Sequence, residues 1–192
     1  MTRIIGGTAG GRRIKTPPGE NTRPTSDRVR EAMFSALEST LGTMAGRCVL
    51  DLYAGSGALA LEAASRGARR ATAVESDRRT ASLISANAQD LRLPVSVVAR
   101  AVEKFVAQPA NQAYDLVFLD PPYALGEGDL ADVVAALVAN GWVHAESLMV
   151  VERSARSPEP RYSAPWATLR MRRYGETALW YVHVAEEQED ST

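Results

Sequence analysis

The sequence predicts an α/β fold in which a mostly parallel sheet carries helices on both faces. Two observations predict it: short apolar runs alternate with stretches of helical periodicity, and the last two apolar runs follow each other with only a short turn between them. Strands separated by helices are typical of βαβ units, which build parallel sheets. The last two apolar runs flank Gly175-Glu176 and predict an antiparallel pair.

The N-terminal segment, 1–25, is predicted to form a basic extension. Two short apolar pieces, 3–6 and 12–15, flank the glycines of GGTAGG and predict a β-hairpin, and PPGENTRPT then indicates an irregular linker. SDRVREAM opens with a Ser-Asp helix start, and apolar residues at helical spacing predict a helix over 26–41. Arg28 and Arg30 are expected on the solvated side of this helix.

The rest of the chain alternates between the two periodicities. Glycine, proline and asparagine mark the ends of most segments, such as Gly67 and Asn140-Gly141. Further helices are predicted over 58–66, 77–90, 102–107 and 129–139. Strands are predicted over 48–52, 71–75, 95–99, 114–119, 147–151, 168–174 and 177–184.

Composition sets limits on the class of protein. The chain has 192 residues, 45% hydrophobic and 23% charged, which favours one globular domain. One cysteine and two histidines supply neither a disulfide nor a zinc site, so no metal is expected. No apolar run is long enough to span a bilayer and no signal peptide is visible, so we expect a cytoplasmic protein without membrane contact.

Charge is distributed unevenly along the chain. The segment 1–30 is strongly basic, because its arginine and lysine side chains far outnumber Glu20 and Asp27, whereas the end reads AEEQEDST. We therefore predict a basic extension over 1–25, a globular domain over 26–185 and an acidic tail over 186–192. A basic arm on an otherwise acidic protein indicates a polyanionic partner, and a solvated extension fits the composition equally well.

The first chemical motif is VLDLYAGSGALALEAASRGA, in which a strand, a turn with Gly55 and Gly57, and a helix follow one another. Ligands of open α/β sheets bind beyond the carboxyl ends of the strands, and glycine allows their close approach. The next strand ends in Glu75, close to the spacing of roughly 20 residues from the glycines at which an acid accepts the hydroxyl groups of a ribose. Asp77 is the better helix cap, which leaves Glu75 for a ligand.

A nucleoside pocket of this kind takes NAD or S-adenosylmethionine. Asp51 at the end of its strand favours S-adenosylmethionine, because a carboxylate repels a pyrophosphate but attracts ammonium and sulfonium charges. A structural role for Asp51, accepting hydrogen bonds from loop amides, is the alternative.

The second motif is YDLVFLDPPY, a strand that runs into two prolines. The prolines stiffen the turn and fix the Asp120 carboxylate, the Pro121 carbonyl and the Tyr123 ring. An exocyclic amine of a nucleobase is a poor nucleophile. Two acceptors can bind its N–H groups and stabilise the positive charge that develops, while the ring stacks on the base. A plain Pro-Pro turn is the alternative interpretation.

These motifs resemble those of a known family. DLYAGSG, Glu75 and DPPY are similar to class I S-adenosylmethionine-dependent methyltransferases, with a Rossmann-like, seven-stranded fold. RIIGGTAGGRRIKTP and RPTSDRVREAMFSAL resemble the RsmD family of bacterial 16S rRNA guanine-N2 methyltransferases, and the resemblance runs from Arg3 to about Val184. It implies methylation of guanine(966) in 16S rRNA, within an assembled 30S subunit or late precursor. We expect a monomer.

The resemblance also implies roles for single residues. The catalytic set is Asp120, Pro121, Pro122 and Tyr123. The cofactor-binding set is Asp51, Tyr53, Gly55, Gly57, Glu75 and Ala101. Many such enzymes place an acid or amide against the adenine where this chain has Arg100, so the backbone of Ala101, or else Glu103, is assigned that contact.

Arginine and lysine side chains of the arm and linker are predicted to bind RNA phosphates, because guanidinium forks pair well with them. The set is Arg12, Arg13, Lys15 and Arg23. A second basic cluster, RMRRY over 170–174, alternates with apolar residues, and a half-exposed strand explains it equally well.

Other functions stay open at this point. The DPPY turn also suits a DNA adenine-N6 methyltransferase, although 192 residues leave little room for a target-recognition region. A protein-glutamine methyltransferase usually carries Asn in place of Asp120. A non-catalytic RNA-binding assembly factor is the alternative from another class, and the intact Asp51, Glu75, Asp120 and Tyr123 argue against it.

Overall fold

The computed structural model describes residues 2–17, 27–122, 124–162 and 164–184. The chain divides into two compact units, Met1–Phe105 and Val106–Thr192. The predictions for Arg23, Tyr123 and the acidic tail over 186–192 lie outside the described residues. Among the helices that are described, none is both long and apolar enough to cross a membrane.

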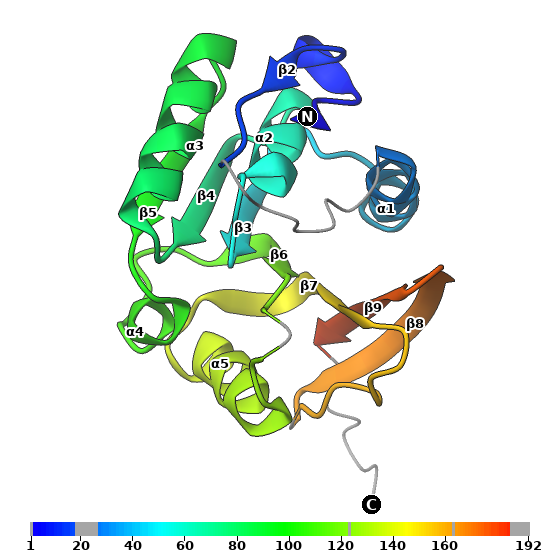
Figure 1. Cartoon of the computed structure of the whole chain (residues 1–192). Coiled ribbons are helices and arrows are strands. Elements are labelled where there is room, and N and C mark those ends of the chain that lie inside the picture. The colour runs from blue at the N-terminus through cyan, green and yellow to red at the C-terminus, as the bar shows by residue number, and fades with distance from the viewer. Residues whose placement is uncertain (1, 18–26, 123, 163, 185–192) are drawn as a thin grey trace, which may run out of the picture. The chain divides into compact units, whose positions relative to one another are not determined.

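The first unit is built on three parallel strands (Figure 1). β3 (Cys48–Leu52) pairs with β4 (Arg70–Glu75), and β4 pairs with β5 (Val95–Ala99). All residues of β3 are buried, as expected for a parallel strand that is covered on both faces. The helices of this part of the chain are α1 (Asp27–Leu41), α2 (Ala58–Ser65), α3 (Arg78–Leu91) and α4 (Val102–Val106).

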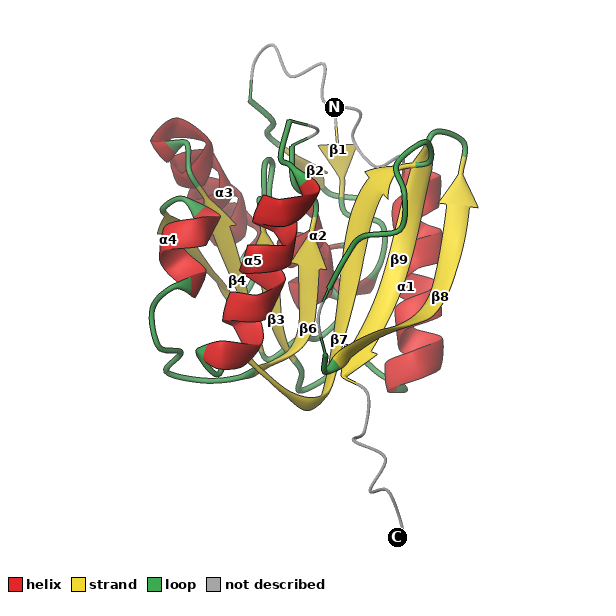
Figure 2. Cartoon of the chain, turned by 90° about the horizontal axis from the view of Figure 1, so that it is seen from below, coloured by secondary structure: helices red, strands yellow, loops and turns green. Residues whose placement is uncertain are grey.

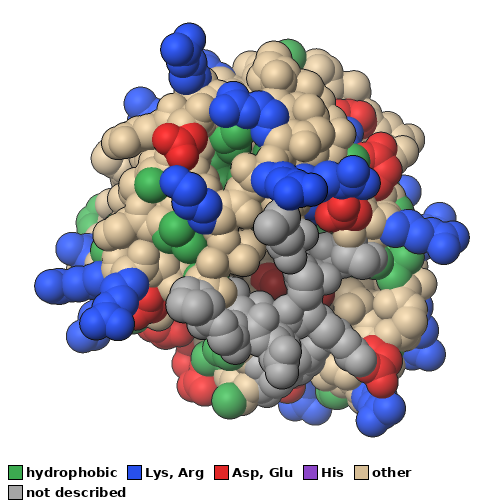
Figure 3. Space-filling view, turned by 45° about the horizontal axis from the view of Figure 1, so that its top comes forward, with side chains coloured by type: hydrophobic (Ala, Val, Ile, Leu, Met, Phe, Trp, Pro, Cys, Tyr) green, Lys and Arg blue, Asp and Glu red, His purple; other side chains and the backbone are tan. Residues whose placement is uncertain are grey.

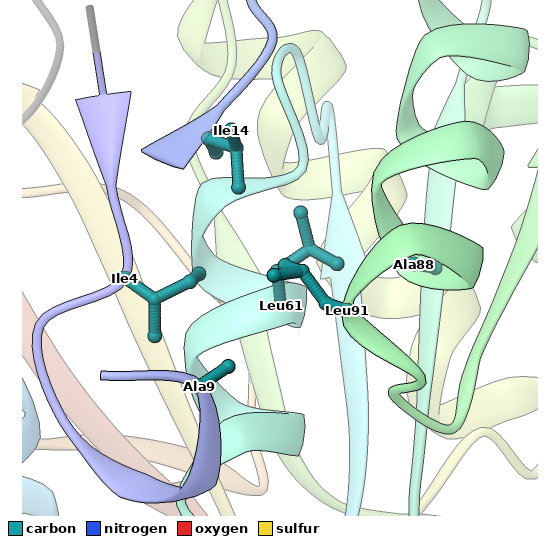
Figure 4. Close-up of a cluster of buried hydrophobic side chains, with 6 residues drawn as sticks. All are labelled: Ile4, Ala9, Ile14, Leu61, Ala88 and Leu91. Atoms are coloured by element: carbon teal, nitrogen blue, oxygen red, sulfur yellow. The ribbon is translucent and has the colours of Figure 1, made fainter. Parts of the chain in front are cut away.

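The N-terminal hairpin is anchored to the first unit by an apolar cluster. β1 (Thr2–Arg3) and β2 (Arg13–Ile14) pair antiparallel around a 3-10 turn, η1 (Gly7–Ala9). The apolar side chains of the hairpin pack with those of α2 and α3, as Figure 4 shows. The cluster comprises Ile4, Ala9, Ile14, Leu61, Ala88 and Leu91. The predicted hairpin is therefore present, although its strands are very short.

A buried carboxylate lies beneath the hairpin. Glu62 of α2 is wholly buried and accepts hydrogen bonds from the backbone N–H groups of Ile5 (2.7 Å) and Gly6 (2.8 Å). Arg66 donates its Nε–H to the same carboxylate at 2.8 Å, and Arg30 Nε lies 3.9 Å from Glu62 Oε2. One acidic side chain thus joins the hairpin to two helices.

The prediction that Arg30 is solvated was wrong. Its side chain is 2% exposed and also donates to the Arg3 carbonyl oxygen and to Asp27 Oδ1. Burial lowers the pKa of Arg30, and the charges of Glu62 and Asp27 oppose this effect. Arg30 is buried because it has acceptors on both sides, which the periodicity of α1 alone does not reveal.

The second unit carries the antiparallel part of the fold. β6 (Tyr114–Leu119) pairs in parallel with β7 (Val143–Ser154). The helix α5 (Glu127–Ala139) lies between these two strands in the sequence. β7 pairs antiparallel with β9 (Thr177–Val184), and β8 (Trp166–Tyr174) pairs with β9 and ends the strand order (Figure 2).

The predicted fold class is confirmed, because the seven strands form one mostly parallel sheet with an antiparallel C-terminal pair. Helix and strand ends agree with the predictions within a few residues. The largest difference is β7, which begins at Val143 rather than Ser147, since its first half is polar and half-exposed and lacks a continuous apolar signal.

We expect Glu62→Ala to lower the free energy of unfolding by about 3–5 kcal/mol, because it leaves Arg66 Nε and two backbone N–H groups without their buried acceptor and removes the carboxylate that faces Arg30. Urea denaturation measures the change. Glu31→Ala is the matched control, since Glu31 pairs with the same Arg66 but is half-exposed, and it should cost at most about 1 kcal/mol. Equal losses in the two variants would contradict this role for Glu62.

Candidate active site

The carboxyl ends of β3, β4 and β5 lie along one edge of the first unit. The strands are parallel, and their register pairs Leu52 with Val74 and Glu75 with Ala99. The loop after β3, the acid that ends β4 and the turn after β5 are therefore neighbours in this unit. This is the edge at which open α/β sheets bind ligands.

The loop after β3 is held in a conformation that most residues avoid. Tyr53, Gly55 and Gly57 have φ values of 61°, 51° and 74°. A Cβ at Gly57 would lie 2.6 Å from Ile84 Cγ2, so this glycine is required by packing. A Cβ at Gly55 would meet no atom within 4 Å, which leaves open space above that part of the loop.

Glu75, which ends β4, is hydrogen-bonded to the loop after β3. Its Oε2 accepts the backbone N–H of Gly55 at 2.9 Å, and its Oε1 accepts that of Asp77 at 2.8 Å. Asp77 caps α3 as predicted, accepting from Thr80 N at 2.8 Å. The expectation that this leaves Glu75 free therefore needs correction. The carboxylate is half-buried and keeps lone pairs for a ligand, but it is already fixed by two backbone donors.

Asp51 is buried below the loop. Its side chain is 1% exposed, and its Oδ2 accepts the backbone N–H of Ala60, in the first turn of α2, at 3.0 Å. Burial, opposed by the Ala60 N–H and reinforced by the charge of Glu75, raises the pKa of Asp51 to about 8. The structural role that the sequence left open is thus present.

The turn after β5 contacts the loop after β3. The Tyr53 hydroxyl donates to Glu103 Oε1 at 2.8 Å, and the backbone N–H of Arg100 donates to the Glu75 carbonyl oxygen at 3.0 Å. The Ala101 carbonyl oxygen accepts from Phe105 N and begins α4. Glu103 is thereby engaged by Tyr53, which favours the backbone of Ala101 over Glu103 as the adenine contact.

The DPPY motif begins where β6 ends in the second unit. The last four residues of β6, Leu116–Leu119, are buried, whereas Asp120 is exposed, Pro121 is buried and Pro122 is exposed. A hydrogen bond of 2.9 Å from Leu125 N to the Pro122 carbonyl oxygen closes the turn. The strand therefore ends abruptly, with a carboxylate at the surface on a rigid support.

The basic residues of the hairpin are exposed. Arg12 donates to the Asp90 carbonyl oxygen at 3.1 Å, and Lys15 pairs with the Asp90 carboxylate at 3.2 Å. The Arg13 side chain makes no hydrogen bond or ion pair to another described residue. Lys and Arg side chains project from many points of the face drawn in Figure 3. Such weak, solvated contacts leave these cations available to phosphate.

The loop and its acid fit S-adenosylmethionine. Open space at Gly55 admits a ligand close to the backbone, Glu75 offers a fixed acceptor for ribose hydroxyl groups, and Asp51 offers a carboxyl that a nearby cation would ionise. A magnesium protoporphyrin IX methyltransferase from Synechocystis, solved with S-adenosylmethionine bound, shares the fold with a TM-score of 0.62 at 11% identity, over 81% of this chain and 79% of that one. This likeness shows the fold, and the loop after β3 with Glu75 at the end of β4 adds the features of a nucleoside site on that fold.

Comparison with known proteins identifies the family. The family model described as "Conserved hypothetical protein 95" matches residues 2–183. Ribosomal RNA small subunit methyltransferase D of Escherichia coli K12 is 37% identical over 177 residues, which cover 92% of this chain and 86% of that protein. The solved E. coli protein yhhF has a TM-score of 0.84 at 33% identity, over 96% of this chain and 98% of that one. The chain belongs to the RsmD family, as the sequence motifs predicted.

Sequence reasoning missed Glu62 as the residue that fixes the hairpin. Its signal is visible in retrospect, because it is the only charged residue within ALALEAAS, an otherwise apolar helix. A lone acid on a buried helix face requires buried partners. Arg30 and Arg66 are those partners.

Two glycine variants should separate packing from ligand contact. We expect Gly57→Ala to lose about 1–3 kcal/mol more unfolding free energy than Gly55→Ala, because only its methyl group overlaps Ile84. Gly55→Ala should instead lose affinity for S-adenosylmethionine, since its methyl group enters the open space. Chemical denaturation and calorimetric titration measure the two effects. Equal stability losses, or unchanged affinity in Gly55→Ala, would refute the assignment.

Asp51 should make stability depend on pH. The folded chain keeps a proton on Asp51 up to a pKa of about 8, whereas the unfolded chain loses it near the ordinary aspartate value of 3.8. The unfolded state therefore binds fewer protons between these two pKa values, and stability falls as pH rises through this window. Asp51→Asn keeps an acceptor for Ala60 N–H but does not titrate, so its stability relative to wild type should rise from pH 5 to 8.

Denaturation curves at several pH values measure this difference. Asp77→Asn is the control, because Asp77 is an exposed cap whose pKa is lowered by its hydrogen bonds with Thr80. Asp77 is ionised in both the folded and the unfolded state above pH 5. The difference in unfolding free energy between Asp77→Asn and wild type should therefore stay constant above that pH. A constant difference for Asp51→Asn as well would show that Asp51 is ionised in the folded chain.

Proposed function

We propose that this protein transfers a methyl group from S-adenosylmethionine to the exocyclic N2 of a guanine in 16S rRNA, guanine(966) by family resemblance. The observation that carries the proposal is the exposed carboxylate of Asp120, which directly follows a buried strand and precedes a buried proline. The names of the relatives, ribosomal RNA small subunit methyltransferase D, support an rRNA substrate.

The first unit holds the methyl donor. Glu75 accepts hydrogen bonds from the ribose, Gly55 and Gly57 shape the loop, and Ala101 contacts the adenine through its backbone. Asp51 ionises beside the positive end of the donor and stabilises it. When bound, S-adenosylmethionine supplies a methyl group on a positively charged sulfur.

The turn after β6 binds the guanine amine, which is the group that accepts the methyl. The Asp120 carboxylate and the Pro121 carbonyl oxygen accept the two N–H groups of the guanine amine, which frees its lone pair from the ring. The carboxylate would also stabilise the positive charge that grows on the nitrogen as the N–CH3 bond forms and the S–CH3 bond breaks, and it would accept the proton that the nitrogen then loses, while the sulfur leaves as a neutral thioether. Pro122 keeps the turn rigid, and Tyr123 stacks on the base, which must be unstacked from its neighbours.

The arm binds the substrate RNA through phosphate. Arg12, Arg13 and Lys15 are exposed on a hairpin that Glu62 and the apolar cluster hold in place. A fixed basic surface loses less side-chain and backbone freedom on binding than a flexible tail would. Arg23 is proposed to act in the same way.

We expect Asp120→Asn to abolish measurable methyl transfer to 30S subunits from a strain that lacks the enzyme, with affinity for S-adenosylmethionine almost unchanged. The amide keeps one acceptor but no negative charge for the developing cation. Radiolabelled methyl transfer and mapping of the modified base measure the reaction. Turnover at the wild-type rate would remove Asp120 from the mechanism.

Glu75→Ala is the companion variant with the opposite pattern. It removes a charged acceptor on the donor side, which is worth about 1.5–3 kcal/mol per hydrogen bond. Cofactor affinity should therefore fall in Glu75→Ala and persist in Asp120→Asn. A methyl group mapped to adenine in DNA, or to no nucleic acid, would replace the proposed substrate.

A further inference from the structure

The outer strand of the second unit, β8, exposes large apolar side chains next to arginines, which edge strands usually avoid. Among the described strands β8 pairs with β9 alone and is the last in the strand order, so it is an edge strand (Figure 2). Leu169 and Met171 are 47% and 39% exposed, and they are the only large hydrophobic residues with that exposure in the described part of the chain. Arg172 and Arg173 follow at once and are exposed too.

A β-bulge directs one of these apolar side chains outward. Thr168 pairs with Val182 and Arg170 with Tyr181, so Leu169 is the extra residue of β8 and has no partner on β9. A bulge of this kind re-aims a side chain and is common near functional sites. The alternation over 170–174, which predicted a half-exposed strand, does not explain the exposure of Leu169.

The cations around the strand are held in place by local contacts. Arg170 lies over the Tyr181 ring, with 4.7 Å from its guanidinium carbon to the ring centroid. Arg173 donates to the Ala155 carbonyl oxygen at 2.9 Å, and the neighbouring Arg156 pairs with Glu176. The Arg172 side chain makes no hydrogen bond or ion pair to another described residue.

We propose that this surface, comprising Leu169, Met171, Arg172 and Arg173, binds an unpaired segment of the rRNA substrate. The inference rests on the proposed function and adds a further RNA contact on the second unit, the unit that also carries Asp120. Guanidinium groups pair with phosphate, and apolar side chains cover the faces of unstacked bases. Arginines on an edge strand can serve to prevent pairing with other strands. That role alone does not explain why Leu169 and Met171 are exposed beside them, because exposed apolar side chains favour association.

The test uses the full chain, protein-free 16S rRNA and 30S subunits from a strain lacking the enzyme, over a salt series. We expect Arg172→Gln/Arg173→Gln to weaken binding to both RNAs and to make the dependence of log K on log salt shallower by about 1.4–1.8, the value for two lost phosphate contacts. Leu169→Ser/Met171→Ser should weaken binding and leave that slope unchanged.

Arg69→Gln/Arg70→Gln is the matched control. It removes the same charge from exposed arginines at the amino end of β4, away from the ligand edge, and it should keep the wild-type slope. Unchanged affinity for S-adenosylmethionine checks folding, and Arg172→Lys/Arg173→Lys should recover the slope.

Three results would overturn the inference. A wild-type slope in Arg172→Gln/Arg173→Gln would show that these cations contact no phosphate. Weakened binding to 30S subunits but not to free rRNA would assign the surface to a ribosomal protein. If the wild-type chain bound and methylated neither RNA, the proposed function would fail, and the second contact would fall with it.

Discussion

The first unit depends on one buried charge. Glu62 accepts two backbone N–H groups from the hairpin and contacts two guanidinium groups, those of Arg30 and Arg66, without access to water. With these partners around it, Glu62 converts a weak two-stranded hairpin into a fixed part of the unit. The helix that carries Glu62 starts at the glycine loop, so the same element supports the arm and the candidate cofactor site.

The acids of the candidate site also combine a structural role with a proposed binding role. Glu75 is proposed to bind a ribose, yet it also holds Gly55 and Asp77 by hydrogen bonds. Asp51 is proposed to face a cation, yet it also accepts from Ala60 and thereby anchors the start of α2. Each acid is positioned by backbone donors before any ligand arrives, which lowers the entropy lost on binding. A variant at either acid therefore changes the loop as well as the binding surface.

Much of the fold could be predicted, because strands and helices of this chain have strong and distinct periodicities. The glycine loop and the DPPY turn were recognisable because glycine and proline restrict the backbone in known ways. The burial of Arg30 and Glu62 was not predicted. The lone acid in the apolar sequence of α2 signals a buried carboxylate, but its pairing with Arg30 of α1 is a tertiary contact that no local pattern encodes. The bulge at Leu169 was missed because it depends on the register with β9.

The packing of the arm bears on how its role is best studied. Deleting the hairpin, segment 1–17, would uncover Leu61 and Leu91 and strip Glu62 of its two amide donors. A truncated protein would then lose activity through a damaged scaffold, whatever the arm does to RNA. Side-chain exchanges on the outer surface of the hairpin avoid this ambiguity, because they leave its inner face intact.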